Sequence, residues 1–270
     1  MTFQQKCSRP TSRDVIVLPR KSPTITVQDE VNRALDNQKN LIELQNHTLE
    51  RTVTERTAEL EAKRLGIQEL LHNMMPSSIA QELEANGTTQ PVRHDSVTIL
   101  FTDFVGFTHA ASVMPANRMV AELNDILGNF DRIMAECGVE KIKTIGDAYM
   151  AVAGAPVFCA DHAQRCTRAG QKMVAYIRDR NTAATFKWAL RVGIHTGPVV
   201  AGVIGTKRIA FDIWGDSVNV ASRMESASEP DRINISAYTY DLIRQEIVCD
   251  YRGKIPVKGK GEMDMYFVRS

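Results

Sequence analysis

Apolar positions divide the chain into a long region with a seven-residue repeat and a later region where short apolar runs alternate with amphipathic stretches. Residues 31–74 contain no proline and a single glycine. The repeat has two core positions, which are occupied by these residues: Leu35, Ile42, Leu49, Leu70, Val53, Leu60, Ile67 and Met74. Such a repeat favours a parallel two-stranded coiled coil. The helix it predicts is also longer than the ~25 residues that globular helices usually reach.

Four polar residues interrupt the core positions of this repeat: Lys39, Asn46, Arg56 and Lys63. Polar core residues lower the stability of a coiled coil but fix its register and strand number. The alternative is an amphipathic helix that packs on its own domain. The length of the segment favours the first interpretation, so we predict a helix that dimerises and transmits a signal over residues 27–75.

The segments on either side of this helix differ from it in composition. Residues 1–26 mix Ser, Pro, Arg and Thr without periodicity, which predicts a flexible N-terminal arm with one short apolar run at residues 15–18. Pro76 disfavours the helical conformation of the residue before it, so the helix is expected to break there. Residues 76–94 would then form a connecting helix and a linker. Ser77 or Ser78 would cap the start of this helix, and Gly87 would end it.

From residue 95 to residue 270 the pattern alternates between strands and helices, which predicts a fourth and last region with one α+β fold. We expect strands at 96–103, 139–144, 148–153, 233–235, 247–251 and 265–268, and helices at 116–137, 161–180, 218–226 and 237–245. A further strand pair, 186–196 and 199–205, is expected to turn at Gly197-Pro198. The order β-α-β-β-α-β is that of the ferredoxin-like split βαβ plan.

Composition excludes several classes of protein. Charged residues make up 24% and hydrophobic residues 43% of the chain, and the net charge of +1 gives no reason to expect nucleic acid as a partner. Five scattered cysteines without a Cys-x-x-Cys motif suit reduced thiols in the cytoplasm. No window approaches the roughly 20 apolar residues of a membrane helix. We therefore predict a soluble, cytoplasmic chain, or a piece of a longer receptor whose sensor or membrane domain lies elsewhere.

Two apolar runs end in carboxylates. The run that begins at Val97 ends at Asp103 and is followed at once by a loop with Gly106, and a second run ends at Gly146-Asp147. Two strands that deliver carboxylates to one sheet edge form a site for hard divalent cations. A glycine-bearing loop before a helix exposes N–H groups that bind phosphate. Together these features indicate metal-dependent chemistry on a nucleoside triphosphate.

The sequence resembles the catalytic domain of class III nucleotidyl cyclases over about residues 95–270, in five motifs that follow in the family's order. The motifs are Phe101-Thr-Asp-Phe-Val-Gly-Phe-Thr108, Lys141-Ile-Lys-Thr-Ile-Gly-Asp-Ala-Tyr-Met150, Leu190-Arg-Val-Gly-Ile-His-Thr-Gly197, Phe211-Asp-Ile-Trp-Gly-Asp-Ser-Val-Asn-Val-Ala-Ser-Arg-Met224 and Val257-Lys-Gly-Lys-Gly261. Residues 70–83 are similar to the short helical element that joins an upstream coiled coil to such domains.

The resemblance implies attack of a ribose 3′-oxygen on the α-phosphorus of the same nucleotide, with pyrophosphate as the leaving group. It assigns Asp103, Asp147 and the backbone of Phe104 to metal, as two Mg²⁺ or Mn²⁺ ions per site. The backbone of the following loop would hold the phosphates, through these residues: Phe104, Val105, Gly106, Phe107 and Thr108. No histidine is needed as a general base, so His162 and His195 are interpreted as packing or hydrogen-bonding residues.

The second half of the site follows from the same resemblance. Asn219 would orient the ribose and Arg223, four residues later on the same helix face, would stabilise charge at the α-phosphate. Arg191 and Lys258 match positions that contact the outer phosphates, and Lys260 is a weaker match.

Base choice rests on Lys143 and Asp212. A lysine donates to adenine N1 and a carboxylate accepts from the exocyclic amine, whereas guanine presents the opposite polarity. Lys141, two residues earlier on the same strand and expected on the same face, is the rival for the lysine position. The Lys-x-x-Gly-Asp spacing selects Lys143.

In the family, the metal aspartates and the base-reading residues of one site come from different chains. Because this chain carries both sets, we expect a homodimer with two equivalent sites. The predicted function is adenylate cyclase. The alternatives are a guanylate cyclase and a non-catalytic module that binds nucleotide or dimerises.

Overall fold

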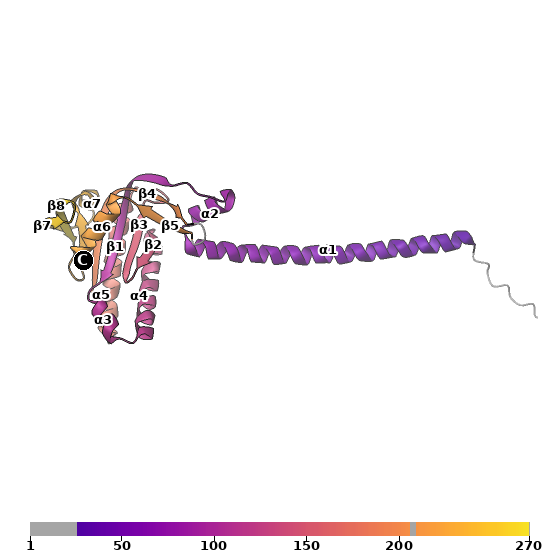
Figure 1. The fold of residues 1–270 in the computed structure, drawn as a ribbon, viewed down its shortest axis with the longest axis horizontal. Coiled ribbons are helices and arrows are strands. Elements are labelled where there is room, and N and C mark those ends of the chain that lie inside the picture. The colour runs from indigo at the N-terminus through magenta and orange to yellow at the C-terminus, as the bar shows by residue number, and fades with distance from the viewer. Residues whose placement is uncertain (1–25, 206–208, 270) are drawn as a thin grey trace, which may run out of the picture. The chain divides into compact units, whose positions relative to one another are not determined.

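The computed structural model describes residues 26–205 and 209–269 (Figure 1). Its internal contacts divide the chain into one unit up to Leu65 and a second from Gly66 onward. The predicted N-terminal arm, with its apolar run at residues 15–18, lies outside the described residues except for Thr26. Within residues 26–205 and 209–269, every helix is too short or too polar to span a lipid bilayer.

Helix α1 runs without a break from Val27 to Met74, which confirms the long helix. None of its 48 residues is buried, and the side chains of the seven-residue repeat are open to solvent, with Leu35 58% and Ile67 66% exposed. An apolar stripe of this length is stabilised when a second helix covers it. The coiled coil itself stays a prediction, and so does the division of the chain at residues 26, 75 and 94.

The break at Pro76 is confirmed, but the predicted serine caps are wrong. Helix α2 spans Ser77–Asn86, and Pro76 itself is its N-cap, with no side chain bonded to the first turn. The fixed backbone of Pro76 already has the extended conformation of a cap, so both serines lie inside the helix. Gly87 ends α2 as predicted, with φ +68° and its N–H bonded to the Leu83 carbonyl.

The second unit is built on one mixed sheet, which confirms the α+β class. Its eight strands lie in the order β2-β3-β1-β4-β6-β8-β7, with β5 paired to β4 beside this path, and only β4 and β6 run parallel. The strands are β1 (Val92–Phe104), β2 (Glu140–Ile145), β3 (Ala148–Ala153), β4 (Leu190–Ile204), β5 (Ala210–Trp214), β6 (Ile233–Ser236), β7 (Cys249–Val257) and β8 (Gly261–Val268). The helices are α3 (Phe107–Val113), α4 (Ala116–Cys137), α5 (His162–Ala183), α6 (Asp216–Ser226) and α7 (Ala237–Ile243).

The prediction of a strand pair that turns at Gly197-Pro198 is wrong. Strand β4 continues straight through both residues and pairs with β1 on either side of them. Pro198 lacks the N–H that a regular ladder needs, and the register with β1 shifts there, between His94 and Val97. A β-bulge in the partner strand thus accommodates the proline, which the sequence pattern alone had indicated as a turn.

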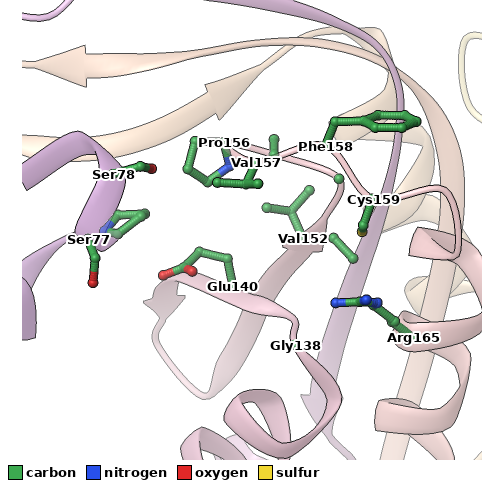
Figure 2. A pocket seen from close by; sticks show the side chains of 14 residues that line it. Ser77, Ser78, Gly138, Glu140, Val152, Pro156, Val157, Phe158, Cys159 and Arg165 are labelled. Carbon is green, nitrogen blue, oxygen red and sulfur yellow. The ribbon is translucent and has the colours of Figure 1, made fainter. Parts of the chain in front are cut away.

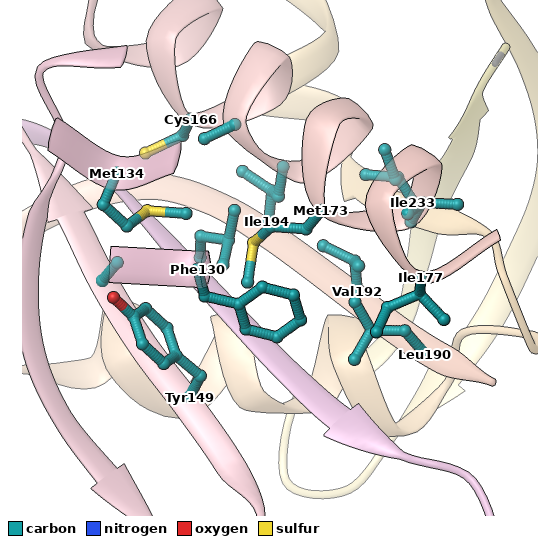
Figure 3. Close-up of a cluster of buried hydrophobic side chains, with 14 of the residues drawn as sticks. Phe130, Met134, Tyr149, Cys166, Met173, Ile177, Leu190, Val192, Ile194 and Ile233 are labelled. Atoms are coloured by element: carbon teal, nitrogen blue, oxygen red, sulfur yellow. The ribbon is translucent and has the colours of Figure 1, made fainter. Parts of the chain in front are cut away.

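Two apolar clusters cover the two faces of the sheet. Alternate residues of β1 point to opposite clusters: Leu100 packs with α4 and α5, and Ile99 packs with β5 and α2. Figure 3 shows the first cluster, in which Phe130 of α4 and Met173 of α5 meet the strands. Helix α6 lies against β4 and β1, and this contact positions the residues discussed below.

We expect Gly193→Ala to destabilise the protein severely. A methyl group at Gly193 of β4 would lie 1.8 Å from the Glu225 backbone nitrogen, so α6 would have to move off the sheet. Overpacking of this kind costs about 1–3 kcal/mol or more. Urea denaturation monitored by circular dichroism measures the loss. The control is Gly128→Ala, at an open position in α4, which should stabilise by about 0.5–1 kcal/mol. Equal stability of Gly193→Ala and wild type would contradict the close packing of α6.

Candidate active site

The end of β1 carries the first of two predicted groups of site residues, the metal-binding group around Asp103 and Asp147. Asp103 is the penultimate residue of β1, and the chain turns at Val105-Gly106, where Gly106 has φ +73° and precedes α3. The Val105 N–H is bonded to the Ala189 carbonyl, so it is not free for a phosphate. Phe107 stacks its ring on Trp188, which leaves only its backbone for a ligand. Within the predicted phosphate-binding loop, the free backbone N–H groups are therefore those at the start of α3, from Gly106 to Thr108.

Asp147 lies in the tight turn between β2 and β3 and reaches the same place. Its carboxylate accepts a hydrogen bond from the Phe104 backbone N–H, and it lies beside the Asp103 carboxylate. Burial, and then the charge of Asp103, raise the pKa of Asp147 to about 6. Two carboxylates forced together in this way are stabilised by a divalent cation.

The donor set fits Mg²⁺ or Mn²⁺ bound together with a substrate. Among residues 26–205 and 209–269, no three acidic, histidine or cysteine side chains converge on one point. Mg²⁺ is commonly held by one or two carboxylates, with substrate phosphates and water completing the shell. Asp103 and Asp147, with the nearby backbone of Phe104, match that arrangement.

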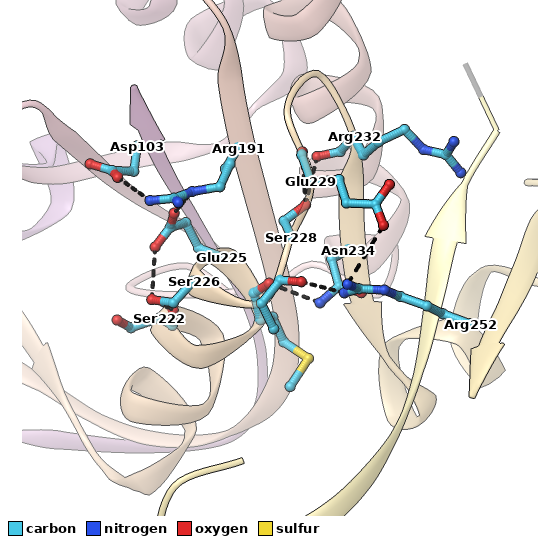
Figure 4. Close-up of polar contacts among 12 residues, drawn as sticks. Asp103, Arg191, Ser222, Glu225, Ser226, Ser228, Glu229, Arg232, Asn234 and Arg252 are labelled. Atoms are coloured by element: carbon cyan, nitrogen blue, oxygen red, sulfur yellow. Dashed lines mark hydrogen bonds and ion pairs between the residues drawn. The ribbon is translucent and has the colours of Figure 1, made fainter. Parts of the chain in front are cut away.

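Arg191 sits directly opposite Asp103 in the ladder between β1 and β4. Its guanidinium bridges two carboxylates, with Nη2 2.5 Å from Asp103 Oδ2 and Nε 2.9 Å from Glu225 Oε1 (Figure 4). Glu225, which is buried on α6, is a site residue that the sequence motifs did not indicate. The periodicity of α6 could have indicated this residue, because it places Glu225 on the apolar face of the helix. A buried carboxylate there needs a charged or hydrogen-bonding partner.

The second predicted group lines a pocket of 430 Å³ between α6 and the turn that joins β7 to β8. Asn219 and Arg223 project from α6 into it, and Lys258 faces them from the turn. All three are exposed, and within the described residues no side-chain hydrogen bond or ion pair engages them. They are open to a ligand that carries phosphate.

Helix α6 separates the two groups. Since successive residues turn by 100°, Glu225 lies 200° from Arg223, on the opposite face of the helix. One face of α6 is therefore joined to Arg191 and Asp103, while the other carries Asn219 and Arg223 into the pocket. The structure brings each group together within the chain but does not bring the two groups to one point.

The base-reading pair meets within the chain. Lys143 Nζ of β2 lies 2.5 Å from Asp212 Oδ2 of β5, and the Asp212 side chain is only 14% exposed. Lys141 was expected on the same face as Lys143, and this is wrong. The register of β2 shifts between the two lysines, and Lys141 instead pairs with Asp131 of α4 at 2.8 Å. The bulge thus leaves Lys143 alone beside Asp212.

Both histidines are hydrogen-bonding residues, as interpreted. His162 Nδ1 lies 2.7 Å from Thr98 Oγ1, and His195 Nδ1 lies 2.8 Å from Ser236 Oγ. Burial lowers the pKa of His195 to about 4.

This shift predicts a loss of stability in acid. Because His195 binds a proton more weakly in the folded chain than in the unfolded one, its contribution falls as the pH drops from about 6.5 to about 4, by about 2 kcal/mol at pH 5. We expect the midpoint of thermal unfolding to fall less between pH 7.5 and pH 5 in His195→Gln than in wild type. Calorimetry at both pH values measures it, and parallel falls in both proteins would exclude His195 as the cause.

A second pocket, of 460 Å³, lies between the start of α2 and the loop after β3 (Figure 2). It is lined by Glu140, Cys159 and Arg165 among others, and none of the predicted site residues reaches it.

Residues 89–270 match the family described as the adenylate and guanylate cyclase catalytic domain, and the chain belongs to this family. Its members generally use Mg²⁺ or Mn²⁺, in keeping with the paired aspartates. The class III resemblance of the sequence motifs is thereby confirmed, and the second unit is a nucleotidyl cyclase domain.

Relatives of both substrate classes are similar to the chain. It is 39% identical over 218 residues to an adenylate cyclase of Mycobacterium tuberculosis, covering 78% of this chain and 48% of the relative. It is 37% identical over 246 residues to the receptor-type guanylate cyclase gcy-28 of Caenorhabditis elegans, covering 89% of this chain and 19% of the relative. The chain thus spans about half of one relative and a fifth of the other.

Solved structures agree on the fold. The guanylate cyclase domain of RhGC from Catenaria anguillulae, in complex with GTP, superposes with a TM-score of 0.63 at 37% identity, over 66% of this chain and 98% of that one. The adenylyl cyclase CyaB from P. aeruginosa gives a TM-score of 0.63 at 31% identity, over 67% and 97%.

Proposed function

We propose that the chain is an adenylate cyclase, which converts ATP to 3′,5′-cyclic AMP and pyrophosphate at two equivalent sites shared across a homodimer. The observation that carries the choice of ATP is the Lys143–Asp212 pair. A base inserted between the two side chains meets one donor and one acceptor. Adenine complements them through N1 and its exocyclic amine, while guanine would leave buried polar groups unpaired.

The roles of the other residues follow from the two groups. Divalent ions held by Asp103 and Asp147 would lower the pKa of the attacking hydroxyl and neutralise phosphate charge. Asn219 orients the ribose so that its 3′-oxygen faces the α-phosphorus, and Arg223 stabilises the charge that develops there. Arg191 and Lys258 hold the outer phosphates, and Arg191 is kept in place by Glu225.

The homodimer is supported by the arrangement of α6. Its two faces point into different regions, so the metal-binding group of one protomer needs the ribose-binding group of its partner to complete a site. The two-fold symmetry of such a dimer gives two identical sites. Among the similar structures, one is described as a non-canonical dimeric guanylyl cyclase domain and another as a monomeric one.

Turnover by the purified chain tests the proposal. ATP and GTP are each supplied with Mg²⁺ and with Mn²⁺, and the products are separated by chromatography. We expect cyclic AMP and pyrophosphate in equal amounts, and ATP turned over faster than GTP. A preference for GTP would make the chain a guanylate cyclase, and no cyclic nucleotide from either would make it a binding module.

We further propose that α1 joins the partner's α1 in a coiled coil that sets the register of the two catalytic domains. The upstream sensor or membrane domain would lie outside this cytoplasmic chain. The receptor type of several relatives supports this arrangement.

Deletions within α1 test that role. Removing four residues between Asn46 and Leu60 rotates the apolar stripe away from the partner, whereas removing seven restores it. We expect cyclase activity to fall with the first deletion and largely return with the second. Both deletions leave the catalytic domain unchanged, so equal activities would show that α1 only tethers the two catalytic domains.

A further inference from the structure

The pocket that holds Asn219 and Arg223 has two walls joined by one ion pair. One wall is α6, which begins at Asp216, and the other is the β7–β8 turn, which carries Lys258 and Lys260. Lys260 Nζ lies 2.5 Å from Asp216 Oδ2. The pair therefore connects the turn to the start of α6, and both of its side chains line the pocket.

The charges around the pocket are unequal. Arg223, Lys258 and Lys260 supply three positive charges, and Asp216 is the one carboxylate among the lining residues. Within the described residues only Lys260 of the three cations is paired. A polyphosphate that enters the pocket would meet Arg223 and Lys258 directly, and would compete with Asp216 for Lys260.

The ion pair between Lys260 and Asp216 can open at little cost, so Lys260 can exchange Asp216 for another anion. Its side chains are 38% and 65% exposed, and ion pairs at such positions contribute little to stability. Asp216 is the first residue of α6, where a carboxylate remains favourable without Lys260 because of the helix dipole. Lys260 follows Gly259 in a tight turn closed by its own N–H to the Val257 carbonyl, so its side chain can swing while the backbone stays fixed.

We propose that Asp216 and Lys260 form an exchangeable latch over the polyphosphate end of the site. In the free protein Lys260 pairs with Asp216. A bound triphosphate draws the Lys260 ammonium to its terminal phosphates, and return of Lys260 to Asp216 speeds release of pyrophosphate. This inference rests on the proposed function, since it assigns the pocket to the phosphates of the nucleotide.

A double-mutant cycle tests the latch. Asp216→Asn, Lys260→Gln and the double variant are titrated with inorganic pyrophosphate and Mg²⁺ by calorimetry, and pyrophosphate inhibition is measured on the same proteins. We expect Asp216→Asn to tighten pyrophosphate binding about threefold or more, because it frees Lys260. In the Lys260→Gln background the same change should have a much smaller effect, so the two substitutions are not additive.

Glu262→Gln is the matched control, since Glu262 is exposed in β8 near the turn and does not line the pocket. It should leave pyrophosphate affinity close to wild type. Equal effects of Asp216→Asn in both backgrounds would show simple charge repulsion and overturn the latch. The calorimetric arm needs no turnover, so failure of the latch is distinguishable from failure of the chain to cyclise ATP. A preference for GTP would change the proposed substrate and leave this cycle intact.

Discussion

Replacing Lys143 by Glu and Asp212 by Cys together is expected to shift the nucleotide preference from ATP toward GTP. The first substitution replaces a donor by an acceptor for the protonated N1 of guanine, and the second removes the carboxylate that would face the guanine carbonyl. Each unmatched buried polar group costs about 1–3 kcal/mol, so the ratio of kcat/KM for ATP over GTP should change by at least tenfold. Steady-state rates with both nucleotides measure the ratio.

The matched control for this experiment is Lys141→Glu. Lys141 belongs to the same strand, but its ammonium pairs with Asp131 on α4, away from Asp212. Its substitution should leave the ratio of ATP to GTP turnover unchanged. A double variant that folds, turns over nucleotide and keeps the wild-type ratio would exclude Lys143 and Asp212 from the base pocket.

The sequence predicted the elements whose pattern is carried by many residues. Helix α4 was expected at residues 116–137 and has those bounds, because its apolar face repeats over six turns. The hairpin of β2 and β3 was placed within a residue by Gly146-Asp147. Long periodic segments and glycine turns depend on local sequence, so they can be predicted before the fold is known.

Elements that depend on tertiary contacts were missed or misjudged. Strand β5 has five residues with Asp212 at its centre, and it forms only because β4 offers an edge. Gly197-Pro198 has the composition of a turn, and a bulge in β1 allows the strand to continue. Lys141 was assigned to the face of Lys143 by a regular alternation that a second bulge interrupts.

The family motifs indicated the individual residues of the candidate site. They did not indicate how these residues contact one another. Nothing in the spacing of Arg191 indicated that Glu225 anchors it, because the two are brought together by the packing of α6 on β4. The two faces of α6 have different roles because one of them packs on β4 and β1, and this contact is not encoded in the spacing of the motifs.

Mixed dimers test most directly the central claim, that each site is completed by both chains. Asp103→Ala and Asn219→Ala chains, with different affinity tags, are co-expressed, and the mixed dimer is isolated through both tags. Each parent homodimer carries a defect in both sites and should lose at least about 100-fold in kcat. In the mixed dimer one site inherits both defects and the other inherits neither.

Activity of the mixed dimer should therefore recover to about half of wild type, or about a quarter in an unseparated random mixture. The control is a mixed dimer of Asp103→Ala with Asp147→Ala. Both changes fall in the metal-binding group, so each site keeps one defect and the dimer should stay inactive. If the Asp103→Ala and Asn219→Ala mixed dimer forms and is as inactive as its parents, the sites are not shared between chains and the account is contradicted.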